Sequence, residues 1–456
     1  MNFPYILLAI LFFGVLIFIH ELGHFIVARL CGVRVLEFAI GMGPKLFSVR
    51  SKKSGIKYSL RLFPIGGFVS MLGENGMETV QGSNDWEEYN HNEKKRSFFV
   101  NENEDVQEQP KKVDPELAKQ AYCNQSVWKR LLISFAGPFM NVSLGFVLML
   151  VLVLAQGPNA MGSNTVGAFF VEYSAEESVA GLQKGDNVEA LNGFRVRSMA
   201  DLKALVSENP SEGYSVVVDR LVDGKIETIT LNNVPLSQAF LESHFDYSRS
   251  EQANLQINDK ILKVNNTRVH TADEVSYEIF NQGYKPLTLT VLRGGEKVEL
   301  TNVMFPTGAE QGVTYGTMDF KLYQEDFKFT TVLKHTFWRS CSTVKMVFDS
   351  LGGLFSGRYG VEAVSGPIGI TQAITTAAKS DWKNVLSLLV MISINLGVMN
   401  LLPLPALDGG HIMIYLIEVV RRKPLKPEVE GIINFVGLAV LLGLAIIISI
   451  KDVISL

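Results

Sequence analysis

The sequence predicts a polytopic α-helical membrane protein that carries two α+β domains outside the cytoplasm. Three observations lead to this prediction. Hydrophobic residues make up 47% of the 456-residue chain and charged residues only 19%, which is more apolar than an ordinary soluble protein of this length. Four apolar segments are long enough to cross a bilayer. Between the second and third of them, the pattern of residues 180–196 returns at 253–269.

We expect the four transmembrane helices at 1–30, 131–156, 385–407 and 432–452. The first segment has no basic residues before it and is too long for a signal peptide, so it should be retained. Lysines and arginines cluster after the first span, before the second, and between the third and fourth. The positive-inside rule therefore places the connecting loops 29–130 and 406–431 in the cytoplasm, and both termini and the 157–382 region outside.

The cytoplasmic part should begin with a β-hairpin at 31–76. Residues 57–62 alternate between apolar and polar side chains, and glycines on both sides mark turns. A free strand edge at 57–62 could hold an extended substrate by strand addition. The alternative is an ordinary cytoplasmic hairpin. The rest, 77–130, is expected to be a flexible polar insertion at 77–112 and a connector to the second span.

The extracytoplasmic repeat has an offset of 73 residues, and three glycines of the first copy become asparagines in the second: Gly181, Gly185 and Gly193 correspond to Asn254, Asn258 and Asn266. Asparagine is among the few residues that tolerate the positive φ typical of glycine. Both copies resemble PDZ domains, which we place approximately at 157–240 and 241–312 and which can interleave. β-Rich spacer domains without a ligand are the alternative. A helical region should follow at 313–384, because apolar residues recur at helical spacing within 328–356.

Charge and cysteine content exclude two other classes of function. The net charge of −4 gives no basis for nucleic-acid binding. The three cysteines cannot form a disulfide framework, and they show no zinc-finger spacing.

An H-E-x-x-H motif interrupts the first apolar segment, where His20, Glu21 and His24 are almost the only ionisable residues. On a helix the two histidines share one face and can reach one metal ion. Zn²⁺ suits two imidazoles and a carboxylate with a fourth position left for water, from which Glu21 can take a proton. Ionisable groups inside a membrane are costly, so we expect function rather than helix–helix pairing.

A third ligand has to come from elsewhere, and Asp408 is the best candidate. The first and third spans cross the membrane in the same direction. His20 and His24 lie in the last third of the first span and Asp408 lies at the cytoplasmic end of the third, so the three can share one depth. His411 is a rival ligand. A site closed by four protein ligands would indicate structural zinc in a PDZ-bearing membrane scaffold without protease activity. A transporter is disfavoured because the spans show no repeats.

This combination of motifs resembles the site-2 protease family of M50-type intramembrane zinc metalloproteases. The resemblance is carried by H-E-x-x-H, by the segment N-x-L-P-x-P-x-L-D-G-G that ends at Gly410, by Ala136-Gly-Pro-Phe-Met-Asn141 in the second span, and by the PDZ-like pair. It covers nearly the whole chain and is closest to the bacterial members that regulate the sigma-E stress response. The 77–112 insertion and the asparagines of the second copy depart from the family pattern.

The resemblance implies a zinc endopeptidase with one Zn²⁺ per chain, held by His20, His24 and Asp408, and with Glu21 as the general base. Prolines in the family motif should bend the third span and free its carbonyl groups. Asn141 in the second span could help to bind substrate or orient the site, and the alternative for it is a hydrogen bond that only holds two helices together. The family positions near the substrate are matched by Asn395, Asn400, Pro403, Pro405, Gly41, Gly43 and Asn141.

The implied substrates are single-span proteins already trimmed on the periplasmic side, above all an anti-sigma factor, with remnant signal peptides as further candidates. Cleavage would release a cytoplasmic fragment that activates transcription. The PDZ-like pair would exclude untrimmed ectodomains by size or sense a new carboxyl terminus. We expect a monomer in the bacterial inner membrane, in contact with lipid and with protein substrates but not with nucleic acid.

Overall fold

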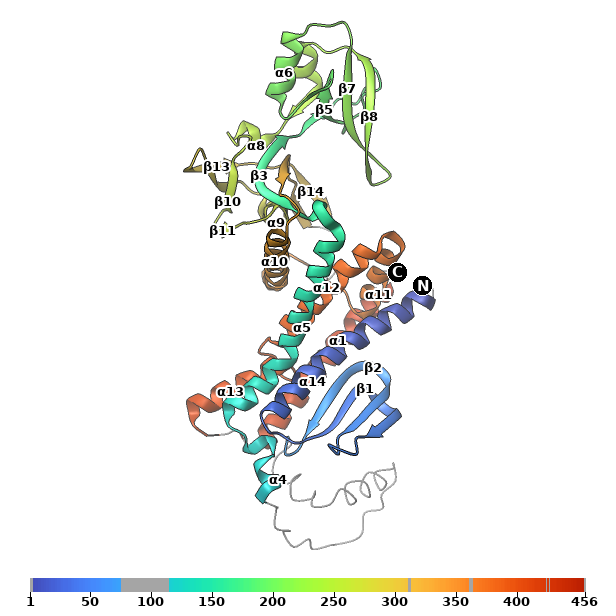
Figure 1. The fold of residues 1–456 in the computed structure, drawn as a ribbon, viewed down its shortest axis with the longest axis vertical. Coiled ribbons are helices and arrows are strands. Elements are labelled where there is room, and N and C mark those ends of the chain that lie inside the picture. The colour runs from blue at the N-terminus through green and yellow to red at the C-terminus, as the bar shows by residue number, and fades with distance from the viewer. Residues whose placement is uncertain are drawn as a thin grey trace. The chain divides into compact units, whose positions relative to one another are not determined.

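A computed structural model describes residues 3–74, 115–310, 313–360, 364–423, 425 and 427–454 of the chain. The described chain forms two compact units, whose elements are labelled in Figure 1. The first unit comprises residues 1–152, 343–354 and 360–456, and the second comprises 153–342 and 355–359. The insertion predicted at 77–112 lies outside the described residues.

Long apolar helices form the frame of the first unit. They are α1 (Phe3–Leu30), α5 (Val127–Gln156), α12 (Trp382–Asn400) and α14 (Pro427–Ile454). Among the described residues, stretches long and apolar enough to cross a membrane are found in these four helices, which correspond to the four predicted spans. The remaining helices outside the sheet domains are α4 (Pro115–Lys119), η1 (Tyr122–Asn124), η2 (Gly157–Ala160), α10 (Phe329–Phe355), α11 (Pro367–Ser380) and α13 (Asp408–Arg421).

The loop predicted at 408–431 is wrong over its first half, because α13 begins at Asp408. The Asp-Gly-Gly sequence there is typical of a turn, but the apolar residues that follow recur at helical spacing. Ile414 and Tyr415 are buried on one side of α13, whereas Val420 is exposed. This pattern gives the helix one face to pack against the unit. The third span also ends earlier than predicted, at Asn400.

The predicted hairpin consists of two long bent strands, β1 (Val35–Arg50) and β2 (Lys57–Met71), which contact α1 (Figure 1). Residues 37–40 lie between two segments of β2, opposite 57–60 on one side and 67–70 on the other. Residues 45–50 pair with 57–61. The two strands thus form four neighbouring segments, in the order 45–50, 57–61, 37–40 and 67–71.

The free edge of this sheet differs from the prediction. Residues 57–60 are paired on both sides, so the edge predicted at 57–62 is wrong. Segments 45–50 and 67–71 each have a partner strand on one side only among the described residues, so they are the two edges of this sheet. The sequence could not show this, because it does not reveal that each strand folds back on itself.

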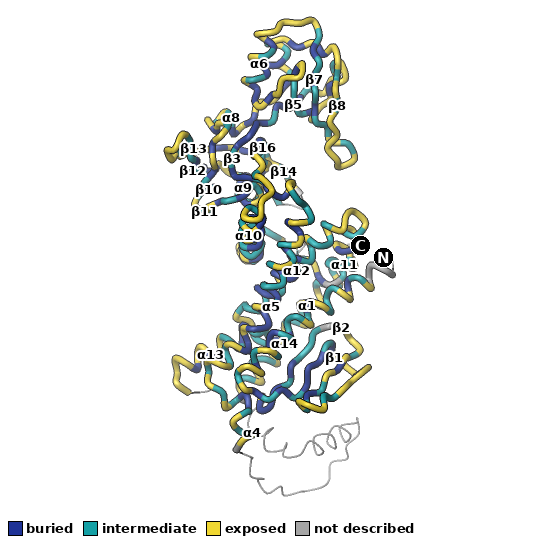
Figure 2. Tube along the Cα trace, viewed as in Figure 1, coloured by how far each residue is buried: buried dark blue, intermediate teal, exposed yellow. Residues whose placement is uncertain are grey.

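Glycines form the bend in β1. Gly41 and Gly43 both have a φ of 84°, a conformation that favours glycine. A Cβ on Gly41 would lie 2.6 Å from the carbonyl oxygen of Phe63, so the close approach of the strands also requires glycine there. The residues beyond the bend, 42–49, are exposed (Figure 2).

Two six-stranded sheets make up most of the second unit, and each contains one copy of the repeat. The first has the order β8-β7-β5-β4-β9 with β6 beside β5, and α6 (Met199–Glu208) contributes to its core. The second has the order β13-β12-β10-β3-β16 with β11 beside β10, and α9 (Ala272–Gln282) contributes to its core. The other elements are β3 (Gly162–Phe169), β4 (Val171–Tyr173), β5 (Asn187–Leu191), β6 (Phe194–Arg195), β7 (Tyr214–Val222), β8 (Lys225–Val234), α7 (Gln238–His244), β9 (Phe245–Tyr247), α8 (Arg249–Gln252), β10 (Lys260–Val264), β11 (Thr267–Arg268), β12 (Leu287–Arg293), β13 (Glu296–Val303), β16 (Phe320–Gln324) and the separate pair β14 (Thr307–Glu310) and β15 (Val313–Gly316).

The two sheets interleave. β3 precedes the first repeat copy but pairs with β10 and β16 in the sheet of the second copy. β4 begins two residues after β3 ends and pairs with β5 and β9. The predicted boundaries of 157–240 and 241–312 therefore cut across both sheets. The helical region predicted from 313 is wrong at its start, since β15 and β16 occupy 313–316 and 320–324.

The two copies of the repeat share positive φ angles at matching positions, and each contains an ion pair of the same kind. Gly181 and Gly185 have φ values of 91° and 89°, and their counterparts Asn254 and Asn258 have 68° and 75°, so the predicted exchange is confirmed for both positions. At the third position the prediction is wrong, because the left-handed residue of the second copy is Asn265 (49°) and not Asn266. Both copies also contain an equivalent ion pair to a buried aspartate, Arg220–Asp186 at 2.7 Å and Arg293–Asp259 at 2.6 Å.

Candidate metal centre

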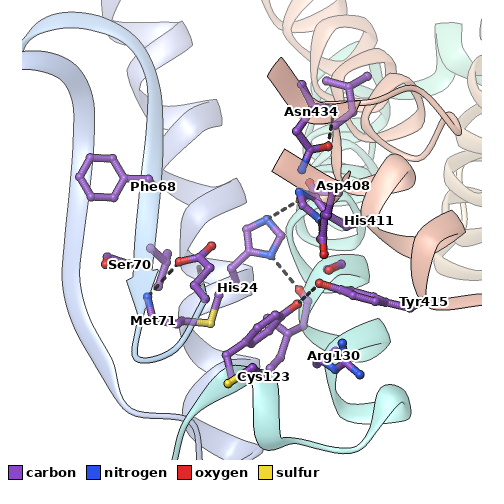
Figure 3. Close-up of a pocket in the computed structure, with 18 of the residues that line it drawn as sticks. His24, Phe68, Ser70, Met71, Cys123, Arg130, Asp408, His411, Tyr415 and Asn434 are labelled. Atoms are coloured by element: carbon purple, nitrogen blue, oxygen red, sulfur yellow. Dashed lines mark hydrogen bonds and ion pairs between the residues drawn. The ribbon is translucent and has the colours of Figure 1, made fainter. Parts of the chain in front are cut away.

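The three predicted ligands meet in the first unit. Figure 3 shows two of them, His24 and Asp408, beside each other. Asp408 Oδ2 lies 3.1 Å from His20 Nε2, and Asp408 Oδ1 lies 3.4 Å from His24 Nε2. The two Nε2 atoms are 3.3 Å apart. Asp408 follows His20 by 388 positions and His24 by 384 in the sequence, yet α1 and the start of α13 bring the polar atoms of the three residues together.

These separations fit one tetrahedral metal ion. Ligand atoms about 2.0–2.1 Å from a tetrahedral Zn²⁺ lie about 3.3 Å from one another. The separations are 3.1 Å from His20 Nε2 to Asp408 Oδ2, 3.4 Å from His24 Nε2 to Asp408 Oδ1 and 3.3 Å between the two Nε2 atoms. Two neutral imidazole lone pairs and a carboxylate facing one another would repel, and a divalent cation between them would remove this repulsion. The donor set of two nitrogens and one oxygen is one that Zn²⁺ uses in catalytic sites.

Helix α5 fixes the orientation of His24. The Nδ1 atom of His24 lies 2.7 Å from the carbonyl oxygen of Ile133, to which it donates its proton. This hydrogen bond leaves Nε2 without a proton and free to bind a metal. Backbone carbonyls commonly hold a metal-binding histidine in this way, because they select both its tautomer and its ring angle.

Asn141, also on α5, has the equivalent position behind His20. Its amide group lies 3.2 Å from His20 Nδ1, and the side chain is fully buried. As placed, the amide nitrogen faces Nδ1 and the amide oxygen has no hydrogen-bond partner. If the amide is turned over, its oxygen accepts the proton of Nδ1, and His20 Nε2 becomes free for the metal. The buried oxygen without a partner thus fits a metal-binding His20.

Glycines give the site its space. A Cβ on Gly137 of α5 would lie 2.2 Å from His24 Nε2, the atom that faces Asp408. A Cβ on Gly23 of α1 would lie 2.4 Å from the carbonyl oxygen of Ala136, so α1 and α5 touch at this level. On the hairpin, a Cβ on Gly67 would lie 2.8 Å from Cγ of Glu21. The sequence motifs contain Gly137 and Gly67, but nothing in their spacing predicted these contacts.

The link between α12 and α13 folds back over the start of α13 and places Asp408. A Cβ on Gly409 would lie 2.1 Å from the carbonyl oxygen of Leu402, and one on Gly410 would lie 2.4 Å from that of Leu404. The Asp-Gly-Gly sequence is therefore required by close packing. Asn434 of α14 accepts a hydrogen bond from the backbone N–H of Ala406 at 3.3 Å and so anchors the link. Sequence reasoning did not find Asn434.

A cavity of about 1090 Å³ opens beside the three ligands, and Glu21 lines it. Glu21 is buried, with 8% of its surface exposed. Residues 67–71, one edge of the hairpin sheet, form one wall of this cavity, and Figure 3 shows Phe68 pointing away from His24. The carboxylate of Glu21, the ligand cluster and an unpaired strand edge therefore all line the same cavity.

The far wall of the cavity comes from α13 and the start of α5. Arg130 and Glu418 form an ion pair at 2.6 Å, with about a tenth of each side chain exposed. The hydroxyl groups of Tyr122 and Tyr415 are 2.9 Å apart, and burial raises the pKa of Tyr122 to about 12. These contacts fasten α13 to α5 and to η1, and burial raises the pKa of both phenols, which are therefore protonated at neutral pH.

His411, the rival ligand, lines the cavity but is not part of the ligand cluster. Its Nδ1 atom pairs with Glu430 Oε1 at 3.2 Å, and this hydrogen bond raises the pKa of His411. Among the described residues, the group able to hold a metal consists of His20, His24 and Asp408. The cluster therefore leaves one position open, as catalytic zinc sites do.

The structure brings some of the predicted substrate residues to the site and not others. Asn400 lines the cavity. Asn395 is exposed on α12 and does not line it. Pro403 and Pro405 follow the end of α12 at Asn400, so the prediction that they bend the third span is wrong. A Cβ on Gly437 of α14 would lie 2.3 Å from Cβ of Pro405, which shows that this proline packs on α14.

Gly41 and Gly43 do not line the cavity either, and their observed role is the bend in β1. Asn141 touches His20 rather than the cavity, so its contact is with a ligand residue.

The comparisons of this sequence with known proteins agree on one protein family. The sequence model described as Peptidase family M50 matches residues 8–444. A putative zinc metalloprotease of Clostridium acetobutylicum is 30% identical over 455 residues, which cover 100% of this chain and 98% of the relative. The regulator of sigma-W protease RasP of Bacillus subtilis is 27% identical, and the probable protease eep of Enterococcus faecalis is 29% identical; each alignment covers 97% of both chains.

Proposed function

Because this chain belongs to peptidase family M50 and is a metalloprotease, we propose that it is a zinc-dependent intramembrane endopeptidase that cuts the transmembrane segments of single-span proteins. The observation that carries this proposal is the position of the ligand cluster. His20 and His24 lie in a helix that is long and apolar enough to cross a membrane, and the site opens into a cavity beside it. Ionisable residues within such a helix indicate function.

In the proposed mechanism, His20, His24 and Asp408 hold one Zn²⁺, which when bound supplies a Lewis acid and an activated water. Glu21 accepts the proton of the attacking water and passes it to the departing amine. Glu21 is buried beside Gly67 and lines the same cavity. Ile133 and Asn141 orient the two imidazoles, so the ligand geometry exists before substrate arrives.

The hairpin sheet could contribute to a step that proteolysis in a membrane requires, the unwinding of a substrate helix. A substrate helix satisfies its backbone groups internally and has to be unwound before a peptide bond can be cut. We propose that the 67–71 edge binds the unwound segment as an added strand, which supplies backbone hydrogen bonds and presents a carbonyl to the site. The position of this edge in the cavity wall supports the proposal. Asn400 would contact the same segment.

We further propose that the substrates are proteins trimmed outside the cytoplasm, among them an anti-sigma factor and remnant signal peptides. The relative named a regulator of sigma-W protease supports a link to sigma-factor control. The proposed enzyme is a monomer with one Zn²⁺ per chain in the inner membrane. Its termini and its two sheets, which we propose to be PDZ-like domains, lie in the periplasm.

A metal-binding scaffold is the competing function, and the site disfavours it. Structural zinc is closed by four protein ligands, whereas three residues form the cluster here and His411 is engaged by Glu430.

The decisive experiment replaces Glu21 with glutamine in membranes that contain a tagged, pre-trimmed single-span substrate. Glutamine has nearly the same size but cannot accept the proton, so Glu21→Gln should retain zinc and lose cleavage by at least about 100-fold, the scale of a lost general base. Zinc content is measured on the same purified protein. Cleavage that continues at the wild-type rate would refute the role of Glu21.

A further inference from the structure

The hairpin sheet contains an ion pair that is largely buried. Arg61 Nη2 donates a hydrogen bond to Glu37 Oε1 at 2.9 Å, and only 18% of the Arg61 side chain and 6% of the Glu37 side chain are exposed. The hydroxyl group of Ser59 donates to the same Glu37 oxygen. Burying two charges costs desolvation free energy, and apolar residues of similar size often stabilise a fold equally well or better. Stability alone therefore does not account for this pair.

Glu37 and the 67–71 edge are neighbours in the sheet. Glu37 lies opposite Ser70, and Ala39, two residues further along, lies opposite Phe68. Side chains of directly opposite residues lie on the same face of a sheet, and so do side chains two positions apart along a strand. Glu37, Phe68 and Ser70 therefore share one face.

The other face of the sheet packs on α1. Phe38 follows Glu37 in β1, and its ring centroid lies 5.5 Å from that of Phe25 and 5.9 Å from that of Phe18, both in α1. The ion pair is thus on the face turned away from α1, in agreement with Figure 3, where Phe68 points away from the site. Contacts with α1 hold one face of the sheet, and the ion pair holds the other.

Arg61 contacts three parts of the hairpin at once. Its Cζ atom lies 4.7 Å from the ring centroid of Phe68, which belongs to the 67–71 edge. Its Nη1 atom donates a hydrogen bond to the carbonyl oxygen of Gly43, in the bend of β1, at 3.2 Å. Its Nη2 atom binds Glu37 in the segment between them. A planar guanidinium suits such a junction, because its donors have fixed directions and its plane can stack on an aromatic ring.

We infer that Arg61 and Glu37 are positioning residues for substrate binding. They hold the Phe68 side chain and the register of the 67–71 edge, so that the backbone of this edge stays in the cavity wall beside the ligand cluster. A slip of one residue would turn the face that carries Phe68 toward α1. This inference deepens the proposed function and rests on it for the binding of an unwound substrate segment to the edge.

Two substrates that differ in helix stability test the inference. Both are pre-trimmed single-span proteins of equal length, and one carries a glycine and a proline in its transmembrane segment, which weaken the helix. The edge matters most for the stable helix, because unwinding that helix frees backbone groups that need new partners. The variants are Arg61→Met, Glu37→Gln and both together in the full-length chain. The control is Lys53→Met, which removes an exposed cation from the turn of the same hairpin.

Arg61→Met should lower the cleavage rate of the stable helix at least about tenfold and that of the weakened helix less than about threefold, because a misplaced edge affects the first most. Glu37→Gln should act in the same direction, and it is nearly isosteric, so it tests the pair even if Arg61→Met does not fold. The double variant should lose no more than the larger single loss, as expected for two residues that act as a unit. Lys53→Met should behave as the wild type, and all variants should retain zinc. Equal losses on the two substrates, or losses that add in the double variant, would overturn the inference.

Disulfide cross-linking gives a second readout that does not depend on cleavage. The Glu21→Gln chain, with its three native cysteines replaced by serine, receives Ser70→Cys on the edge, and the stable-helix substrate carries one cysteine in its transmembrane segment. We expect a cross-link whose yield falls about tenfold when Glu37→Gln is added and does not change with Lys53→Met.

The two readouts separate this inference from the function on which it rests. A cross-link that never forms, or a yield that Glu37→Gln leaves unchanged, would overturn the positioning role. A wild-type chain that cleaves neither substrate would contradict the proposed function instead, and the cross-link would still decide whether the ion pair positions the edge.

Discussion

At the scale of single residues, the site depends on glycines, which have no side chain to fill it, as much as on the ligand residues. Gly137 faces the ligand atom of His24, and Gly67 faces Glu21. Asn141 and the carbonyl of Ile133 stand behind the two imidazoles. The ligands themselves follow from the H-E-x-x-H spacing, whereas these supporting contacts depend on how three helices and a strand approach one another.

Gly137→Ala should abolish most activity. The new methyl group would lie 2.2 Å from His24 Nε2, so either the imidazole or helix α5 has to move. A displacement of about 1 Å in a catalytic site can cost about 100-fold in rate. Cleavage of a reporter substrate and zinc content would be measured together. Gly14→Ala in α1 is the control, because a Cβ there meets nothing within 4 Å. Equal activity of the two variants would contradict the close packing at Gly137.

Asn141→Leu should weaken zinc binding by about 10–100-fold, the usual effect of losing the group that orients a ligand. Leucine cannot accept the Nδ1 proton of His20. Asn141→Asp should retain binding, because a carboxylate oxygen can accept that proton. Competition titration with a zinc chelator measures both. If the leucine variant binds zinc as tightly as the wild type, Asn141 acts on substrate or on packing rather than on His20.

At the scale of elements, pairing within the chain covers some strand edges and leaves others open. The 67–71 edge of the hairpin sheet faces the cavity, while the edges of β4 and β3 are covered by β9 and β16. β9 is only three residues long, and it places Asp246 opposite Glu172. Like charges directly opposite on paired strands destabilise the pairing.

Burial, followed by the Asp246 carboxylate, raises the pKa of Glu172. A raised pKa in the folded state means that protonation stabilises the β4–β9 pairing. This stabilisation is complete below the pKa of a free glutamate and is lost as the pH rises through the higher folded value. Glu172→Gln imitates the protonated form and should strengthen the pairing at neutral pH by about 0.2–1 kcal/mol.

Hydrogen exchange at residues 245–247 of the full-length protein measures this effect. Exchange should slow in Glu172→Gln at pH 7, and the difference from wild type should shrink at acidic pH. Glu227→Gln is the control, since Glu227 faces Arg220 in the same sheet and its removal relieves no repulsion. Faster exchange in Glu172→Gln than in wild type would contradict the account.

At the scale of the whole molecule, the sequence predicts the apolar helices, the repeat and the ligand set, because each leaves a local signal. Helical spacing within α1 defines His20 and His24, and charge distribution gives the depth of Asp408. The sequence did not predict α13, whose start resembles a turn, or the free edge at 67–71. It also did not predict that β9 pairs with β4, since strand exchange between two similar copies leaves no pattern in either.

The central claim is that three residues distant in sequence hold one zinc ion with a position left open. X-ray absorption at the zinc edge of the purified protein tests it most directly. We expect one Zn²⁺ per chain with two imidazole nitrogens and two oxygens about 2.0–2.2 Å away. The spectrum should be unchanged in His411→Gln, and zinc should be lost in Asp408→Ala. A third imidazole in the wild-type spectrum, or zinc retained in full by Asp408→Ala, would contradict the account.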